Sequence, residues 1–332
     1  MPANCQHELT LNQETKVTQA PLRAVVIGAG IGGLSATLRL AHAGLAVTVI
    51  DMAPTPGGKM RTRASVAGPV DIGPTVMTLK PVFEALFADV GARLSDHVTL
   101  IPETVLARHF WRDGATLDLG DDADRNAAAI RAFGGDAAER QFRRFCARAA
   151  RLYAAFEGPM LHAPEPRLTG LTAHVLKNPD LIPAMAPGRS LASSLASQFS
   201  DPRLRQLFGR YATYVGGSPY KSPAVLGLIW HSEASGVWRV AGGMHKLATA
   251  MQKLAQDKGA QFRFGTRAVR IEQQDGHVTA VHLEDGSRLA TDLVVFNGDP
   301  KALVEGHLGN GPRKAVPVAG VAARSLSAFV WG

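Results

Sequence analysis

The chain has 332 residues, of which 46% are hydrophobic and 19% are charged, which is ordinary for a globular protein. Its length predicts about two domains. The net charge of +8 would suit nucleic acid or an anionic membrane surface, and because no recognised nucleic-acid motif occurs we expect the membrane and no nucleic acid. Cys5 and Cys146 lie far apart and indicate neither a disulfide framework nor a metal site, which suits a reducing cytoplasm.

Residues 1–21 are polar and lack the apolar centre of a signal peptide, so we expect a disordered leader. Nowhere does an apolar run reach the roughly 18 residues that a membrane-spanning helix needs. Any contact with a membrane is therefore expected to be peripheral.

The segment VVIGAGIGGLSA, residues 25–36, is the most informative part of the sequence. A short apolar run leads into Gly28-x-Gly30-x-x-Gly33, and an Ala- and Leu-rich pattern follows, which predicts a strand, a tight turn and a helix. In a dinucleotide-binding turn, Gly28 permits the turn, Gly30 lets the backbone approach a pyrophosphate, and Gly33 lets the helix pack close to the strand. The first turn of the helix then offers free N–H groups and a positive dipole end to the phosphates.

A second apolar run, residues 45–50, ends in Asp51, 18 residues after Gly33. An acid at the end of the second strand is where a ribose hydroxyl is bound in this class of site. The alternative, that Asp51 is an ordinary residue of a turn, is less favoured in this context. The unit is therefore predicted to bind a dinucleotide.

Two segments downstream favour FAD over a nicotinamide cofactor. GGKM, residues 57–60, resembles the paired-glycine motif of flavoproteins with two dinucleotide-binding domains, in which bare backbone passes close to the cofactor phosphates. DIGPT, residues 71–75, resembles the stretch that runs along the isoalloxazine ring in carotenoid desaturases. A surface turn and a Gly-Pro loop are the alternative interpretations. Together these motifs imply that FAD is bound by Gly28, Gly30, Gly33, Asp51, Gly58, Lys59, Gly73, Pro74 and Thr75.

The middle of the chain, residues 81–235, is predicted to form a mainly helical substrate domain inserted into the nucleotide-binding one. The Pro-rich stretch 159–190 shows little periodicity and is expected to be loop or broken helix. Hydrophobic spacing and end signals predict helices over 81–92, 136–157, 202–214 and 222–233, and strands over 98–101, 105–111 and 115–119.

The helix predicted over 136–157 has an apolar stripe and a basic remainder. A basic amphipathic helix can lie on anionic lipid. The alternative, a helix of the inserted domain with a solvated arginine face, is the favoured interpretation. The arginines concerned are Arg140, Arg143, Arg144, Arg148 and Arg151.

From residue 236 onward, alternating helix and strand patterns return and are predicted to complete the nucleotide-binding domain. A helix is expected to begin after Gly242-Gly243-Met244, and the loop 265–269 to reach back toward the adenine end of the cofactor. Strands are predicted over 261–264, 267–273, 277–283 and 292–296. The expected division of the chain is 1–21, 22–80, 81–235 and 236–332.

Segments spread over almost the whole chain resemble the bacterial phytoene-desaturase family of FAD enzymes. DIGPTVMTLKPVFEALFADVGARL and SEASGVWRVAGGMHKLA are most similar to its methoxyneurosporene (1-hydroxycarotenoid 3,4-) desaturase branch, which acts in carotenoid biosynthesis of purple phototrophic bacteria. The resemblance implies an α/β fold in which a Rossmann-like, amine-oxidase-like FAD-binding domain carries an inserted helical substrate domain. The segments are residues 25–36, 57–60, 71–78, 201–208, 214–224, 236–244 and 294–300.

The resemblance further implies FAD-dependent desaturation of an acyclic C40 carotenoid, at the 3,4 bond of 1-hydroxy- or 1-methoxy-neurosporene. The substrate is expected to come from lipid and the electrons to pass to oxygen or a quinone, at the cytoplasmic side of an inner or intracytoplasmic membrane. The catalytic base is not assigned, and no spacing of His, Glu or Cys suggests a metal. His231, Glu233, His245 and Asp299 lie in family-like segments and could be near the ring, although such single residues are more often structural.

Three alternatives stay open. The first is a phytoene desaturase, and the second is a flavin oxidase of amines or porphyrinogens built on the same fold. The third is a non-catalytic isoprenoid-binding protein like the GDP-dissociation inhibitors, against which the intact glycine turn and Asp51 argue. Members of the resembled family continue well past this length, so we also expect a C-terminal truncation that leaves the flavin weakly held.

Overall fold

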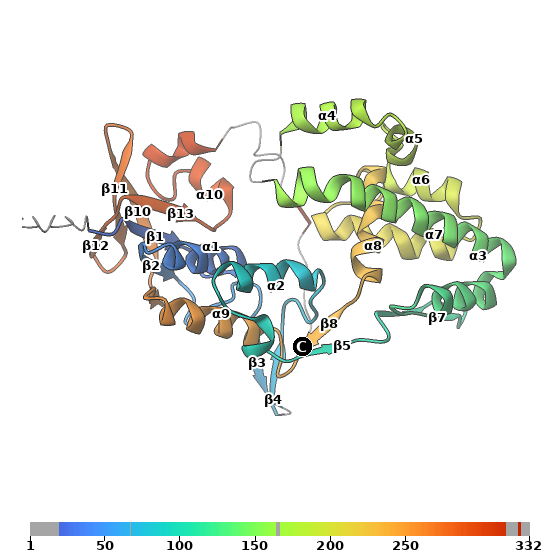
Figure 1. Cartoon of the computed structure of the whole chain (residues 1–332), viewed down its shortest axis with the longest axis horizontal. Coiled ribbons are helices and arrows are strands. Elements are labelled where there is room, and N and C mark those ends of the chain that lie inside the picture. The colour runs from blue at the N-terminus through green and yellow to red at the C-terminus, as the bar shows by residue number, and fades with distance from the viewer. Residues whose placement is uncertain (1–19, 67, 164–166, 317–324, 327–332) are drawn as a thin grey trace, which may run out of the picture.

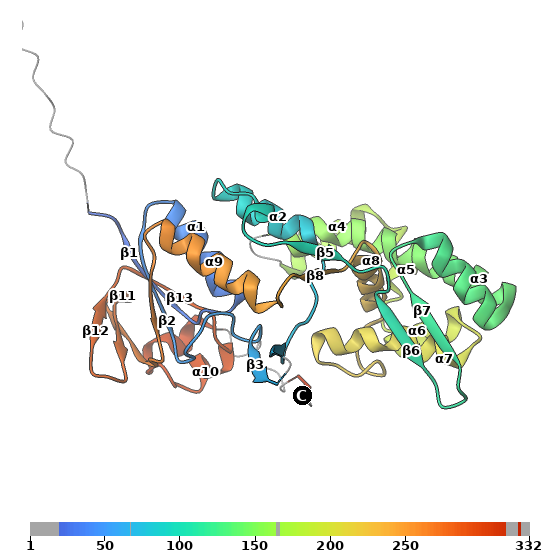
Figure 2. The same cartoon turned by 90° about the horizontal axis from the view of Figure 1, so that it is seen from below.

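The structure is a computed structural model, and it describes residues 20–66, 68–163, 167–316 and 325–326 (Figure 1). The leader predicted over 1–21, apart from its last two residues, and the chain end after residue 326 lie outside these ranges. One lobe contains the main sheets and the other is mainly helical (Figures 1 and 2). The antiparallel strands β5 (Leu100–Pro102) and β8 (Trp238–Val240) lie between the two lobes.

The first lobe is built on a four-stranded parallel sheet in the order β13–β1–β2–β9. The chain passes from β1 through helix α1 to β2 on one side, whereas β13 pairs with β1 on the other side. The gap between β1 and β13 is thus the topological switch point, where sheets of this kind bind ligands at the carboxyl ends of their strands. The strands are β1 (Arg23–Ile27), β2 (Ala46–Asp51), β9 (Gln261–Phe264) and β13 (Leu293–Phe296).

Strands β1 and β2 are covered on both faces, which explains their continuous apolar sequences. Successive residues of a strand face opposite sides, so Val26 and Val49 join the core under α1 and α9, while Val25 and Ile50 join a second core. An antiparallel sheet, β10–β11–β12, contributes to that second core. The bounds are α1 (Ile31–His42), α9 (His245–Asp257), α10 (Pro300–Val304), β10 (Ala268–Gln274), β11 (His277–Leu283) and β12 (Arg288–Ala290).

Helix α2 (Lys80–Asp89) packs against the first lobe, whereas the predicted division assigned residues from 81 onward to the substrate domain. Its Leu86 and Phe87 are buried in the same core as α1 and α9. The hydrophobic spacing predicted the helix correctly, but an amphipathic stripe does not specify which apolar face it meets. The rest of the division into domains stays a prediction.

The second lobe is organised around α3 (Ala123–Phe156), which is kinked at Gly135, where φ is 81°. The helix predicted over 136–157 corresponds to the part after this kink. The stretch 159–190 was expected to be loop or broken helix, and its described residues form short separate helices. Helix α4 contains no proline, which is consistent with proline interrupting helices. The helices of this lobe after α3 are α4 (Leu168–Lys177), α5 (Leu181–Met185), α6 (Leu191–Gln198), α7 (Pro202–Gly209) and α8 (Ile229–Ala234).

Short elements complete the described chain. The predicted hairpin strands around residues 105–119 are confirmed, whereas the hairpin of β3 and β4 and the strand β12 were not predicted. The helices predicted over 202–214 and 222–233 each change to or from a tighter 3-10 helix within their length. The bounds are β3 (Thr62–Ser65), β4 (Gly68–Asp71), β6 (Ala107–Phe110), β7 (Thr116–Leu119), a π-helical turn over Glu157–His162, and 3-10 helices over Leu94–Asp96, Arg210–Val215, Ala224–Leu228 and Gly311–Ala315.

Phe208 of α7 is at the centre of the aromatic core of the helical lobe. Its ring centroid lies 4.5 Å from that of Phe145, 5.1 Å from Phe199 and 5.6 Å from Trp230. Because the side chain is fully buried, Phe208→Ala leaves a cavity, and we expect it to lower the free energy of unfolding by about 3–5 kcal/mol. Urea denaturation measures this change. The exposed Phe110→Ala is the matched control, and an equal loss for the two variants would contradict the packing described.

Candidate functional site

The glycine-rich turn joins β1 to α1 without room for side chains. Gly28 has a φ of 103°, and its N–H donates to the Ile50 carbonyl oxygen (2.7 Å). A Cβ atom on Gly33 would lie 1.9 Å from the Gly28 carbonyl oxygen, so only glycine allows α1 to approach the turn this closely. Gly30 is the N-cap of α1 and no side chain caps it, which leaves the first N–H groups of the helix available to an anion.

Asp51 links this turn to the end of β2. One of its carboxylate oxygens accepts a hydrogen bond from the Ala29 N–H (2.7 Å) and the other accepts one from the Ala53 N–H (2.8 Å). Each oxygen keeps a further lone pair that a ribose hydroxyl can use. The N–H groups of Gly265 and Thr266 donate to the carbonyl oxygens of Ala53 and Asp51, so the loop 265–269 does reach this end of the sheet.

The paired glycines lie against the same turn. The Gly57 N–H donates to the Ala29 carbonyl oxygen (2.8 Å), and Gly57 forms a parallel bridge with Gly30. A Cβ atom on Gly58 would lie 3.1 Å from the Gly30 Cα. The structure therefore brings the backbone of Gly58 beside the turn, and the exposed Lys59 follows it directly.

The DIGPT segment continues from the paired glycines. A Cβ atom on Gly73 would lie 1.8 Å from the Lys59 carbonyl oxygen, so the two segments touch through their backbones. Gly73, Pro74 and Thr75 are all exposed. This open run suits the predicted position along a planar ring, although their predicted contact with FAD stays a prediction.

Residues from after the helical lobe hold the DIGPT segment in place. A carboxylate oxygen of Asp71, Oδ2, accepts from the Met244 N–H at 2.9 Å, and the backbones of Met77 and Trp238 exchange hydrogen bonds of 2.7 and 2.8 Å. The other oxygen, Asp71 Oδ1, is buried and has no hydrogen-bond partner within the described part of the chain. A buried carboxylate oxygen without a donor is costly, so this atom is available to a hydroxyl of a bound ligand.

Asn297 is a site residue that the sequence reasoning missed. It directly follows β13, at the switch point, and its side chain lies against the glycine turn. Its amide nitrogen would lie 3.1 Å from a Cβ atom on Gly30 and 3.1 Å from one on Gly33, and its amide oxygen 2.6 Å from one on Gly32. The signal was present in the VVFNGDP segment, but nothing local to that segment shows which turn it meets.

These features together fit FAD. The uncapped end of α1 and the bare glycines would hold the pyrophosphate, Asp51 a ribose, and the Lys59 side chain the negative charge. Asp71 Oδ1 would accept from a hydroxyl of the cofactor. When bound, FAD supplies two-electron redox chemistry, and the protein supplies binding and orientation.

None of the four suggested acid–base candidates stands out as a base in the structure. His245 Nε2 lies 3.0 Å from the Pro56 carbonyl oxygen, and Asp299 Oδ1 accepts from the Lys301 N–H. The His231 ring packs at 5.0 Å from the ring of Tyr153, and burial lowers the pKa of this histidine. All three side chains thus have positioning contacts, and the catalytic base remains unassigned.

The fourth candidate, Glu233, is the centre of a buried polar cluster in the helical lobe. It accepts hydrogen bonds from Tyr211 Oη (2.7 Å), Tyr214 Oη (2.7 Å) and Arg210 Nη2 (2.5 Å). Burial, together with the hydrogen bond to this carboxylate, raises the pKa of Tyr214 to about 12. Glu233 therefore links α8 to the 3-10 helix that follows α7 through hydrogen bonds from three side chains, which is a structural role.

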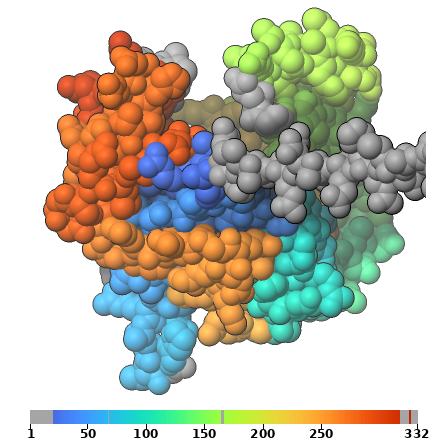
Figure 3. All heavy atoms as spheres, turned by 60° about the vertical axis from the view of Figure 1, so that its left-hand side comes forward, coloured from blue at the N-terminus to red at the C-terminus, as the bar shows by residue number. Residues whose placement is uncertain are grey.

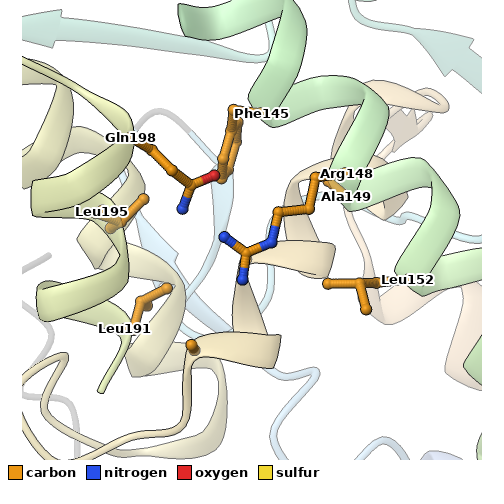
Figure 4. A pocket seen from close by; sticks show the side chains of 9 residues that line it. Phe145, Arg148, Ala149, Leu152, Leu191, Leu195 and Gln198 are labelled. Carbon is orange, nitrogen blue, oxygen red and sulfur yellow. The ribbon is translucent and has the colours of Figure 1, made fainter. Parts of the chain in front are cut away.

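A cavity between α3 and α6 is too small for a polyene (Figure 4). The Arg148 guanidinium points into it, between Phe145, Leu195 and Gln198. Its volume of about 10 Å³ is at the lower limit for a single water molecule. Arg148 donates to the Ala184 carbonyl oxygen (2.6 Å), so this arginine of the predicted basic face is turned inward.

Within the residues that the structure describes, no group of three or more His, Cys, Asp or Glu side chains is arranged to hold a metal ion. Nor does that part of the chain contain a helix with the length and apolar character needed to cross a bilayer.

The fold and the glycine-lined site define a dinucleotide-binding flavoprotein. The sequence profile of the flavin containing amine oxidoreductases matches residues 31–319, and the chain belongs to this family. The predicted fold class and the predicted cofactor, FAD, are confirmed by this assignment.

Individual relatives agree with the resemblance stated from the sequence. The chain is 52% identical over 309 residues to hydroxyneurosporene desaturase of Cereibacter sphaeroides, covering 93% of this chain and 62% of that protein. It is 32% identical over 312 residues to a lycopene-forming phytoene desaturase of a Paracoccus species, covering 93% of this chain and 60% of that protein. A triple mutant of putrescine oxidase has a similar fold, with a TM-score of 0.59 at 16% identity, over 87% of this chain and 60% of that one.

Flavin binding is expected to depend on Gly30. A Gly30→Val side chain would stand over the uncapped end of α1, against Asn297, and we expect it to abolish FAD binding. Gly170→Val is the matched control, because Gly170 also lies in the first turn of a helix but has nothing within 4 Å of its Cβ position. Flavin absorbance after gel filtration measures retention, and a yellow Gly30→Val protein would show that the turn is assigned wrongly.

Asn297 is expected to tune the same affinity through charge. Asn297→Ala removes one amide from the turn and should weaken FAD binding up to about tenfold. Asn297→Asp places a carboxylate beside the phosphates and should weaken it further, with the difference shrinking as salt is raised. Quenching of flavin fluorescence during titration of the apoprotein gives the affinities. Asn310→Asp, an exposed change in the same lobe, is the control, and identical affinities for all four proteins would remove Asn297 from the site.

Proposed function

We propose that this protein is an FAD-dependent desaturase of an acyclic C40 carotenoid, acting on the 3,4 bond of 1-hydroxy- or 1-methoxy-neurosporene. The observation that carries the proposal is the 52% identity to a hydroxyneurosporene desaturase, against 32% to a phytoene desaturase over a similar length. The complete glycine turn supports an enzyme rather than a carrier, because a protein that only binds isoprenoids does not need it. The chain spans about 62% of the length of this relative, so activity is proposed for the protein as a whole.

The reaction would remove one hydrogen from each of two adjacent carbons. FAD, when bound, would supply the two-electron acceptor, and a base or water would take the proton. The exposed run of Gly73, Pro74 and Thr75 supports a position for the reacting carbons over this segment. Reoxidation of the reduced cofactor requires an acceptor, for which we propose oxygen or a quinone.

A carotenoid is insoluble in water, so we propose that the enzyme collects its substrate from lipid. The net charge of +8 favours an anionic surface, at the cytoplasmic face of an inner or intracytoplasmic membrane. Attachment would be peripheral, and no nucleic-acid partner is proposed.

The substrate proposal is tested by product analysis. The FAD-loaded protein is incubated with vesicles that contain 1-hydroxyneurosporene, 1-methoxyneurosporene or phytoene, and separately with putrescine. We expect one additional conjugated double bond in the first two carotenoids only, seen as a red shift of the absorption bands, and none with Gly30→Val. Conversion of phytoene alone would assign the protein to the early desaturases, and oxidation of putrescine alone would make it an amine oxidase.

A further inference from the structure

Residues 157–163 and 167–185 form a projection at the edge of the helical lobe, and it carries several exposed apolar side chains. Figure 1 shows α4 as the outermost helix of this lobe, and the space-filling view shows the same residues, in yellow-green, standing out from the surface (Figure 3). Helix α4 contains no buried residue. The exposed apolar side chains of this projection are Met160, Leu161, Leu168, Leu176 and Ile182.

The exposed side of α4 has an apolar stripe. Leu168, Thr172 and Leu176 are spaced by four residues, and all three are exposed, with Leu168 at 83% and Leu176 at 71%. Leu171 and Val175 are half-buried and belong to the opposite side, which faces the lobe. Helix α4 thus has a second, exposed apolar stripe that does not contribute to the core of the described chain.

The charges around this stripe suit an anionic surface. Arg167 precedes the first turn, the exposed Lys177 ends the last one, and residues 168–177 contain no Asp or Glu. An apolar stripe bounded by basic residues is the pattern of a helix that lies in a membrane interface, with its leucines below the lipid phosphates and its lysine beside them.

The arginine face of α3 is less suited to this role than its sequence suggests. Arg143 forms ion pairs of 3.0 Å with both Glu139 and Asp124, and Arg151 is paired with Asp180. Arg148 is turned into the lobe. Two of the five arginines of this face are therefore paired with carboxylates and a third is turned inward, whereas Arg140 and Arg144 are exposed.

We propose that α4 is the membrane-docking element of this projection, and that Leu168 and Leu176 insert into the interface of a bilayer containing anionic lipid. The proposal rests on the proposed function only in its choice of partner, because a polyene must be collected from lipid. The basic residues at both ends of the stripe, with no carboxylate between them, favour lipid over a second copy of the chain as the partner.

The test is sedimentation of the full chain with vesicles of phosphatidylcholine containing 30% phosphatidylglycerol. We expect Leu168→Ser and Leu176→Ser each to lower the partition coefficient about tenfold, since each loses one buried apolar side chain. Lys177→Glu should lower it several-fold at low salt and have little effect at high salt. Phe110→Ser is the matched control, because the apolar side chain of Phe110 is as exposed as that of Leu176, at 71%, and lies at another part of the lobe. Arg143→Glu should have a smaller effect than Lys177→Glu.

Each result decides the proposal. Unchanged binding of the Leu168→Ser/Leu176→Ser double variant, or an equal loss with Phe110→Ser, would overturn it. So would a dimer, seen by analytical ultracentrifugation, that the double variant dissociates without loss of lipid binding. Because the replaced side chains are exposed, the melting temperature should not change, which separates docking from folding. Vesicles without carotenoid are used, so a wrong substrate assignment would leave this result intact.

Discussion

The contact between Gly33 and Gly28 is the constraint on which the rest of the site depends. Helix α1 starts so close to the end of β1 that a single methyl group would collide with the turn. Because the turn is this tight, the Ala29 peptide is presented to two partners at once, the Asp51 carboxylate and the Gly57 N–H. Three segments that are separate in sequence thereby meet on bare backbone, which is the surface that a pyrophosphate requires.

Local patterns were sufficient for the parts of the fold that are locally determined. The strand, turn and helix around Gly28 and the acid at Asp51 follow from spacing alone, and β9, β10, β11 and β13 from short apolar runs bounded by turns. The docking of α2 could not be predicted, because its stripe fits either lobe. Helix α4 was obscured by neighbouring prolines and by leucines that face both the lobe and the solvent.

The contacts that were not predicted join residues far apart in the sequence. Asn297 approaches the Gly28 carbonyl oxygen across 269 positions, and Asp71 binds the Met244 N–H across 173. A periodic pattern cannot predict such a contact. It forms only when β13 joins the sheet and the turn before α9 reaches Asp71. The same reasoning applies to two arginines of α3, because Arg143 meets Asp124 and Arg151 meets Asp180 only in the folded chain.

Strand β8 explains why a motif outside the glycine turn belongs to the site. Trp238 pairs with Pro102 of β5 on one side and with Met77 on the other, and its ring lies against Gly236, where φ is 120° and a Cβ would be 2.5 Å from the ring. A larger residue at 236 would push this ring away. The chain that leaves the helical lobe is thus held against Met77, just after the DIGPT segment, so one strand connects the helical lobe to the candidate cofactor site. The desaturation proposed above would need this coupling, because the reacting carbons of a long chain must be held at a defined point above the ring.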